Sequence, residues 1–232
     1  MQQQTASVFA THWNIYQKII VHNYMLHAEF AGQTALAFKK LDTAQPLKVL
    51  DLGCGDAHQI AEQLKLQPVD SYTGYDLSAV ALQHAKRNLT SVGCTTHLIE
   101  AELQSFAAQE HRMFDVIYSS YAIHHLQDGQ KQQLLRDCFK SLRGKGAVIV
   151  IDIIRGEDQA KEEYVEQYIS GIENYWAQLT PDEKGLIYEH IRNYDFPSSI
   201  IQLSSWAMEA GFTVEQSPVL DQMHKMLVLH KQ

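Results

Sequence analysis

Two glycines and two acids are spaced along this chain as they would be in a nucleotide-binding site. Residues 49–57 read VLDLGCGDA, so an apolar run that contains Asp51 leads into Gly53 and Gly55. The pattern predicts a buried strand that ends in a tight turn, where backbone N–H groups can approach a ligand closely because glycine has no Cβ. Asp76 ends a second strand-like run, one strand–helix–strand unit later. An acid at that position usually holds a ribose diol, so these four residues predict a site for an adenosine-type cofactor.

Side chains that could exchange protons follow a later strand-like run at 114–119. Tyr121 comes first, and His124 and His125 follow it. An imidazole with an unperturbed pKa of about 6.5 can act as a general base near neutral pH. The same two histidines could instead hold the loop after the strand or contact a cofactor, so the sequence leaves both roles open.

Strands and helices alternate through the middle of the chain and would position these residues. Strands are predicted at 48–52, 71–76, 96–99, 114–119 and 147–154, and helices at 57–66, from Ser78 onward and at 131–142. The run AVIVIDII at 147–154 is apolar on both faces, which is typical of a central parallel strand. The alternation predicts a doubly wound α/β sheet with right-handed crossovers.

Helical patterns flank this alternating region. Apolar and aromatic residues recur at spacings of three and four over 11–41, which predicts one or two helices. Residues 157–194 are almost entirely helical in pattern, and Thr180-Pro181-Asp182-Glu183 is a capping box that begins a second helix there. A further helix at 198–210, ended by Gly211, precedes two strand-like pieces at 212–216 and 226–230.

Composition restricts the partners and the compartment. The chain has 232 residues, 45% of them hydrophobic, and a net charge of −8. Because an acidic surface repels phosphate backbones, nucleic acid is not the expected partner. The three cysteines form no CxxC pair and no H-x-x-x-H pair occurs, so neither a disulfide framework nor a metal site is predicted. We expect a cytoplasmic protein without a signal peptide or membrane span, and a homodimer is compatible with the sequence.

The motifs, taken in order, resemble a known family. The segments VLDLGCG, YDLS, IEAEL, FDVIYSSYAIHHL and LRGKGAVIVIDI resemble the class I S-adenosylmethionine-dependent methyltransferases of the small-molecule type. The resemblance spans 48–154, and 210–230 is in keeping with it. It implies a seven-stranded, mostly parallel sheet with an antiparallel last hairpin. It also implies a single methyltransferase domain over 1–232: an N-terminal helical cap (1–45), a cofactor-binding core (46–155), a helical lid inserted after the fifth strand (156–197) and a last helix with a strand pair (198–232).

The resemblance assigns cofactor roles to particular residues. Asp51, Gly53 and Gly55 would form the loop beneath the methionine and ribose parts, with Cys54 contributing mainly backbone. Asp76 would accept both ribose hydroxyls, and Leu77 would pack on the adenine. Glu102 and Leu103 resemble the pair that binds the adenine amino group, although this acid is commonly Asp and Glu100 offers a second register. Ser119, Ser120 and Tyr121 would line the methionine end.

The implied reaction is methyl transfer from S-adenosylmethionine to N, O, C or S of a small molecule by in-line displacement, which leaves S-adenosylhomocysteine. Such transfer often needs only alignment and exclusion of water, so a base such as His124 or His125 is not obligatory. Aromatic residues of the flanking helices could contact the acceptor or could simply pack. These candidates are Tyr16, Tyr24, His27, Tyr168 and Trp176.

Three alternatives remain at this stage. An NAD(P)-dependent oxidoreductase also uses a glycine turn and a distal acid, but its fingerprint requires a small third residue where this chain has His58. A non-catalytic subunit that binds the same cofactor would be expected to have a broken turn or a missing acid, and both are intact. The sequence does not exclude an enzyme that uses a carboxylated or otherwise altered cofactor.

Overall fold

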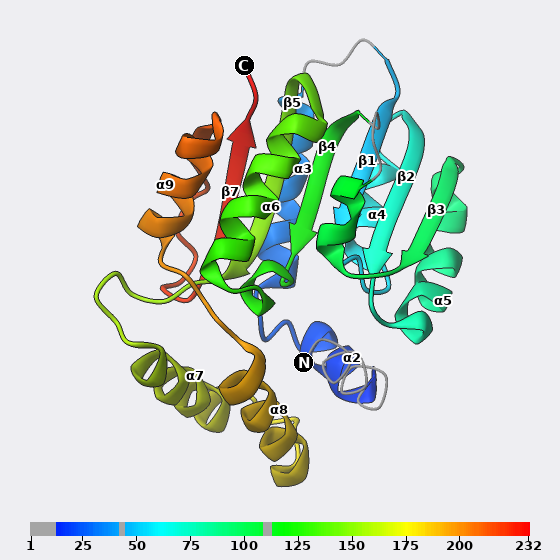
Figure 1. Cartoon of the computed structure of the whole chain (residues 1–232). Helices are drawn as coiled ribbons and strands as arrows, with labels where there is room; N and C mark the ends of the chain where they lie inside the picture. Colours follow the sequence, from blue (N-terminus) through cyan, green and yellow to red (C-terminus); the bar gives the residue numbers. More distant parts are fainter. Residues whose placement is uncertain (1–12, 42–44, 109–112) are drawn as a thin grey trace.

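A seven-stranded sheet forms the centre of the computed structural model, which describes residues 13–41, 45–108 and 113–232 (Figure 1). Residues 1–12 and 42–44, which belong to the predicted N-terminal helical cap (1–45), lie outside the described part of the chain. The strand order is β3-β2-β1-β4-β5-β7-β6. The strands are β1 (Leu47–Leu52), β2 (Val69–Asp76), β3 (Thr95–Glu100), β4 (Phe114–Ser120), β5 (Leu142–Ile153), β6 (Thr213–Gln216) and β7 (His224–His230).

Strands β1 to β5 pair in parallel, and β7 lies antiparallel between β5 and β6. Val49 of β1 aligns with Tyr72 of β2 and with Val116 of β4. The strands β1 and β2, which end in the predicted glycine turn and in Asp76, are therefore direct neighbours in the sheet. This arrangement confirms the doubly wound, mostly parallel seven-stranded sheet. The parallel strands end at a common edge, where ligands of open α/β sheets bind.

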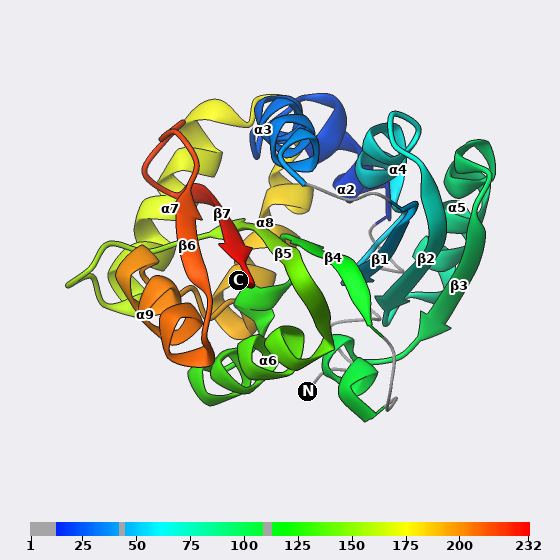
Figure 2. The same ribbon diagram turned by 90° about the horizontal axis from the view of Figure 1, so that it is seen from above.

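Helices cover both faces of the sheet (Figures 1 and 2). The helices are α2 (Trp13–Val21), α3 (His27–Lys39), α4 (His58–Leu64), α5 (Ala79–Asn88), α6 (Asp128–Ser141), α7 (Lys161–Tyr175), α8 (Pro181–Tyr194) and α9 (Ile200–Ala210). Helices α3, α4 and α5 pack on the face that includes Val49, and α6 and α9 pack on the face that includes Leu50. Val49 and Leu50, which are neighbours in β1, therefore face opposite cores, because successive side chains of a strand point to opposite faces of the sheet. Within the described residues, no helix has the length and apolar character needed to cross a membrane.

Local signals in the sequence set several helix ends. The Ser78 hydroxyl accepts a hydrogen bond from the Ala81 N–H and so caps α5, as predicted. Thr180 and Glu183 make the reciprocal bonds of the capping box at the start of α8, as predicted. Gly211 has φ +108° and ends α9. Strand β5 begins five residues earlier than predicted, because Leu142 already pairs with Phe114 of β4.

Helices α2, α7 and α8 lie together beyond the carboxyl ends of the parallel strands (Figure 1). The ring of Tyr24 stacks on that of Trp176 with 4.9 Å between centroids, and the Tyr24 hydroxyl accepts the N–H of Gln178 at 2.9 Å. Lys18 of α2 pairs with Glu183 of α8, with 2.6 Å between Nζ and Oε1. The N-terminal helix and the helices after β5 thus form one cover over this edge of the sheet.

Candidate active site

The turn after β1 is built around two glycines with positive φ, +74° at Gly53 and +51° at Gly55. The N–H groups of Gly53 and Cys54 both donate to the carbonyl of Tyr75, at 2.8 and 2.9 Å, which fixes the turn against β2. A Cβ on Gly53 would stand 2.4 Å from the Cβ of Ala122, whereas a Cβ on Gly55 would only reach ordinary contact with the Tyr16 hydroxyl. Gly53 is therefore required for packing against the loop after β4 as well as for its φ.

Asp76, the last residue of β2, holds both sides of the turn. Its Oδ2 accepts the Gly55 N–H at 2.8 Å, and its Oδ1 accepts the Ser78 N–H at 2.8 Å. Burial raises the pKa of this carboxyl above its ordinary value, although the two backbone N–H groups act in the opposite direction. Each carboxylate oxygen keeps a lone pair with which it could accept a hydroxyl.

A cavity of about 430 Å³ opens beside this turn at the carboxyl edge of the sheet. Most of the predicted cofactor residues line it, together with two of the catalytic candidates and one of the substrate candidates. These lining residues are Tyr16, Gly53, Gly55, Asp76, Leu77, Glu102, Leu103, Ser120, Tyr121 and His125. The structure thus brings together residues from α2, from the turn after β1 and from the ends of β2, β3 and β4.

Three predicted cofactor residues lie behind the cavity and do not line it. Asp51 is buried and accepts the Tyr72 hydroxyl at 2.6 Å. Burial raises the pKa of Asp51 to about 7, although the bond from Tyr72 acts against the rise. Cys54 is buried, so it can offer the site only its backbone, and the Ser119 hydroxyl donates to the carbonyl of Leu52 at 2.8 Å. Asp51, Cys54 and Ser119 are therefore structural supports of the turn and the strands, and their buried side chains do not face the cavity.

A second cavity of about 140 Å³ lies under the helical cover and shares Tyr16, Tyr121 and His125 with the first. Tyr168, Trp176 and His124 line this smaller cavity. Tyr24 and His27 line neither cavity. Tyr24 stacks behind Trp176, and the buried ring of His27 packs edge-on against Tyr121 with 5.0 Å between centroids.

Tyr121 stands at the junction of the two cavities in a strained conformation, with φ +53°. Its hydroxyl donates to the carbonyl of Met25, and its N–H donates to the carbonyl of Ile151 at 2.8 Å. Because its hydroxyl is engaged by the segment between α2 and α3, Tyr121 is suited to hold the cover on the sheet. The strain is consistent with a position that the surrounding structure fixes for binding.

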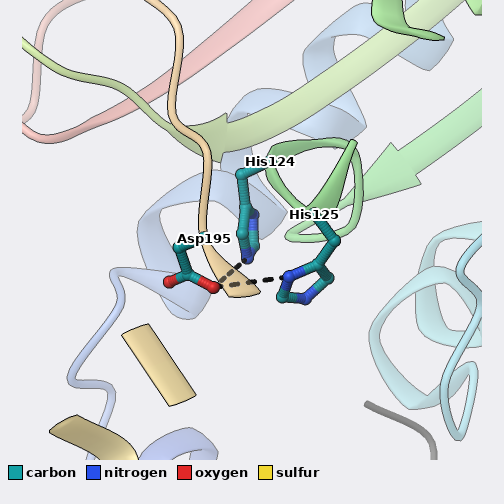
Figure 3. A group of neighbouring side chains, drawn as sticks. All are labelled: His124, His125 and Asp195. Atoms are coloured by element: carbon teal, nitrogen blue, oxygen red, sulfur yellow. Dashed lines mark ion pairs between the residues drawn. The ribbon is translucent and has the colours of Figure 1, made fainter. Parts of the chain in front are cut away.

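Three ionisable side chains that line the smaller cavity, His124, His125 and Asp195, lie close together (Figure 3). The Oδ1 atom of Asp195 lies 3.7 Å from Nε2 of His124 and 3.3 Å from Nδ1 of His125. Nδ1 of His124 is 2.5 Å from Oδ1 of Asp152, which fixes the orientation of that imidazole. Burial lowers the pKa of His124, but Asp152 and Asp195 raise it more, so the net shift is upward and favours the imidazolium.

His124, His125 and Asp195 also offer three atoms within 4.8 Å of one another, as a metal site would. Two contacts oppose this use. Nδ1 of His125 lies 3.2 Å from the carbonyl oxygen of Tyr194, which favours a hydrogen on that nitrogen, and both nitrogens of His124 face carboxylates. Since a metal needs unprotonated ligands, the contacts suit a proton-binding network better. The expectation of no metal stays a prediction.

Three residues around this group escaped the sequence analysis. Asp195 and His190 come from the end of α8, with 3.4 Å between Asp195 Oδ1 and His190 Nε2. Lys131 of α6 is buried, and its Nζ donates to the Phe196 carbonyl and, at 2.7 Å, to the Ser198 hydroxyl, so it holds the segment that carries Asp195. A charged residue within an amphipathic helix or at its end is ordinarily exposed, so no local pattern marked these three.

A parallel sheet with a glycine turn after its first strand and an acid after its second defines an α/β protein that binds an adenosine-type cofactor. The family model described as a methyltransferase domain matches residues 49–146. This matched segment carries the glycine turn and Asp76, and it supports the resemblance of the chain to the class I S-adenosylmethionine-dependent methyltransferases. The antiparallel β7 between β5 and β6 also departs from the 3-2-1-4-5-6 order of dinucleotide-binding oxidoreductases.

Curated relatives are similar over part of their length. Phosphoethanolamine N-methyltransferase 1 of Zea mays is 32% identical over 155 residues, which are 64% of this chain and 29% of the maize protein. The carboxy-S-adenosyl-L-methionine synthase of Campylobacter jejuni is 30% identical over 110 residues, which are 47% of this chain and 46% of that protein. The chain therefore spans less than half the length of either relative.

Solved structures share the fold over more of the chain. The magnesium protoporphyrin IX methyltransferase of Synechocystis PCC 6803, solved with bound S-adenosylhomocysteine, superposes with a TM-score of 0.67 over 98% of both chains at 11% identity. An O-methyltransferase family protein of Burkholderia thailandensis superposes with a TM-score of 0.64 over 87% of this chain and 56% of its own at 13% identity. At these identities the likeness concerns the fold alone.

Proposed function

We propose that this chain transfers a methyl group from S-adenosylmethionine to a small-molecule acceptor. The observation that carries the proposal is the pair of adjoining cavities. The larger cavity lies at the glycine turn and Asp76, the smaller one lies under the helical cover, and both are lined by Tyr16, Tyr121 and His125. A cofactor in the first cavity and an acceptor in the second would meet at these shared residues, as in-line displacement requires.

The residues around the larger cavity fit the parts of S-adenosylmethionine. Asp76 would accept hydrogen bonds from the ribose hydroxyls, and Gly53 and Gly55 would allow the backbone to approach the cofactor. Leu77 and Leu103 would enclose the adenine. Glu102 would accept a hydrogen bond from the adenine amino group. The bound cofactor supplies an electrophilic methyl group on a sulfonium. Asp51 accepts the Tyr72 hydroxyl at 2.6 Å beneath the turn and so joins β1 to β2 where the cofactor would bind.

Helices α2, α7 and α8 are proposed as the lid over both cavities. The stack of Tyr24 on Trp176 and the ion pair of Lys18 with Glu183 join the N-terminal helix to the segment after β5. By excluding water, such a lid strengthens the electrostatic interactions in the site and aligns the acceptor. In this interpretation α2, α7 and α8 select the acceptor, and 46–155 hold the cofactor.

The residues that line the cavities favour S-adenosylmethionine over a carboxylated form of this cofactor. A carboxylated sulfonium carries an additional negative charge, which would need a cationic partner when buried. Among the described residues, no Lys or Arg lines the smaller cavity, into which the group carried by the sulfonium would project. We therefore propose the ordinary cofactor for this chain, in contrast to the product named for the Campylobacter jejuni relative.

Transfer of radiolabelled methyl groups tests this function. The purified, tag-free chain is incubated with a small-molecule extract and with methyl-labelled S-adenosylmethionine at a concentration near its Kd for the wild-type chain. Asp76→Asn is the matched variant with weakened cofactor binding. We expect label in a small-molecule fraction with the wild-type chain and much less label with the variant. Binding of S-adenosylhomocysteine without any transfer would favour the non-catalytic subunit, and stabilisation by NAD(H) alone would favour the oxidoreductase.

A further inference from the structure

The smaller cavity has apolar walls over most of its surface. These walls include isoleucines from two helices, α2 and α8, and from the end of β5: Ile15, Ile19, Ile187, Ile191 and Ile153. Its volume of about 140 Å³ is close to the ~150 Å³ of an engineered apolar protein cavity that binds benzene. An acceptor that fits this cavity is about the size of a single six-membered ring.

The ionisable side chains around this cavity form a cluster that contains two carboxylates, Asp152 and Asp195. His124 lies between two carboxylates, 2.5 Å from Asp152 and 3.7 Å from Asp195, so one imidazolium faces two acids. Burial raises the pKa of Asp195, but His124 and His125 lower it more, so this buried carboxyl stays ionised. Burial lowers the pKa of His190 to about 4, so that imidazole is neutral and does not compensate Asp195.

Cationic side chains close to this cluster are committed elsewhere. Lys131 pairs with Asp128, with 3.6 Å between Nζ and Oδ1, and Nζ of Lys161 lies 3.9 Å from the centre of the Phe196 ring; neither lysine lines the cavity. Since no Lys or Arg lines the cavity among residues 13–41, 45–108 and 113–232, an anionic group on the acceptor would be buried there without a partner. Burying such a charge unpaired is costly, so the cavity selects against phosphate and carboxylate groups.

We propose that the smaller cavity binds a compact, otherwise apolar amine as its ammonium ion, held by the carboxylate of Asp195 and by the surrounding aromatic rings. This inference rests on the proposed function and names its acceptor class. The rings of Tyr121, Tyr168 and Trp176 line the same cavity, and aromatic faces attract cations. The phosphate-bearing amine named for the maize relative lies outside this class.

The ammonium must lose one proton before its nitrogen can attack. His125 lines both cavities, and its Nδ1 lies 3.3 Å from Asp195 Oδ1, so the carboxylate would stabilise the imidazolium that forms when His125 takes this proton. The amine lone pair then forms the N–C bond, the C–S bond breaks, and its electron pair returns to sulfur. The products are a methylated ammonium ion and a neutral thioether, and the proton on His125 leaves to solvent.

Isothermal titration calorimetry on the complex with S-adenosylhomocysteine tests the proposal with three probes. Cyclohexylamine and cyclohexanol have nearly the same shape and differ in charge, and phosphoethanolamine adds the anionic group. We expect cyclohexylamine to bind at least tenfold more tightly than cyclohexanol, and phosphoethanolamine to give no measurable heat. Tighter binding of phosphoethanolamine, equal binding of the first two probes, or Zn²⁺ binding that excludes the amine would each overturn the proposal.

Asp195→Asn should remove the preference for cyclohexylamine, whereas Asp221→Asn should keep it. Asp221 pairs with His224, with 2.7 Å between Oδ2 and Nδ1, and it lines neither cavity, which makes it the matched control. If Asp195→Asn does not fold, His125→Gln supplies a second variant, which should retain amine binding but lose methyl transfer. Failure of S-adenosylhomocysteine to bind at all would refute the proposed function, whereas binding without discrimination between the probes would refute only this inference.

Discussion

The carboxylate of Asp76 accepts a hydrogen bond from the backbone N–H of Gly55, with 2.8 Å between Oδ2 and the nitrogen. The acid at the end of β2 therefore holds the turn after β1 in place while it faces the larger cavity. Two motifs separated by a full strand–helix–strand unit thus act as one structure. This coupling means that the acid has both a binding role and a shaping role.

Asp76→Asn should weaken the binding of S-adenosylhomocysteine by about 1–3 kcal/mol, or roughly 5- to 150-fold. Asparagine has an NH2 group in place of one carboxylate oxygen. This NH2 group would face the N–H of Gly55 or Ser78, which is also a donor, and it could not accept a hydrogen bond from a ribose hydroxyl. Calorimetric titration measures the effect. Asp70→Asn, at the exposed start of the same strand, is the control and should keep wild-type affinity. Equal affinities for all three proteins would show that Asp76 does not hold the cofactor.

Gly53→Ala should be more damaging than Gly55→Ala. Both glycines have positive φ, so both substitutions cost about 1 kcal/mol of backbone strain. Only the Gly53 methyl group would lie 2.4 Å from Ala122, which adds an overpacking cost of about 1–3 kcal/mol. Urea unfolding measures the difference, and Ala122→Gly should rescue Gly53→Ala in part. No rescue would mean that the close approach to Ala122 is not what requires glycine here.

These two glycines also show what the sequence could predict. The β1 turn, the acid at the end of β2, the Ser78 cap and the Thr180 capping box are local patterns, and each was located correctly from sequence. Asp195 is different, because its carboxylate meets His124 and His125, about seventy residues earlier, only when α8 folds over β4 and β5. The same holds for Lys131, whose burial depends on the segment 196–198. Tyr24 and His27 share the helical spacing of Tyr16, so spacing alone could not tell that only Tyr16 reaches a cavity.

Asp51→Asn should change the pH dependence of stability. In the folded chain the pKa of Asp51 is about 7, against an unfolded value near 3.8, so the folded state holds the proton over a wider range. Its contribution to the free energy of unfolding therefore falls as pH rises from about 4 to about 7, by roughly 4 kcal/mol in total. An asparagine still accepts the Tyr72 hydroxyl but has no charge to bury. The free energy of unfolding of the variant, measured in urea, should therefore increase relative to that of the wild type from pH 4 to pH 8. A difference between the two proteins that does not change with pH would contradict the raised pKa of Asp51.

Tyr24→Ala should weaken acceptor binding and leave S-adenosylhomocysteine binding unchanged. Tyr24 lines neither cavity, but it stacks on Trp176, which lines only the smaller one. Steady-state kinetics with an acceptor and calorimetry with S-adenosylhomocysteine separate the two effects. Tyr24→Phe keeps the stack and should be close to wild type, as should Tyr175→Ala, whose ring is 77% exposed. An equal loss for both ligands would indicate a general unfolding of the cover.

Chelators should not change activity. Nδ1 of His125 faces the Tyr194 carbonyl at 3.2 Å, and His124 is paired with Asp152, so these atoms are engaged as hydrogen-bond partners. Dialysis against a strong chelator, followed by the methyl-transfer assay and by elemental analysis of the protein, tests this. Loss of activity that stoichiometric Zn²⁺ or Fe²⁺ restores would instead identify His124, His125 and Asp195 as metal ligands.

A crystal structure grown with S-adenosylhomocysteine tests the central claim most directly. We predict electron density for the nucleoside in the larger cavity, with both ribose hydroxyls within hydrogen-bond distance of Asp76 and the sulfur beside the residues shared with the smaller cavity. Density for the ligand elsewhere on the molecule, or a ribose that does not contact Asp76, would contradict this assignment.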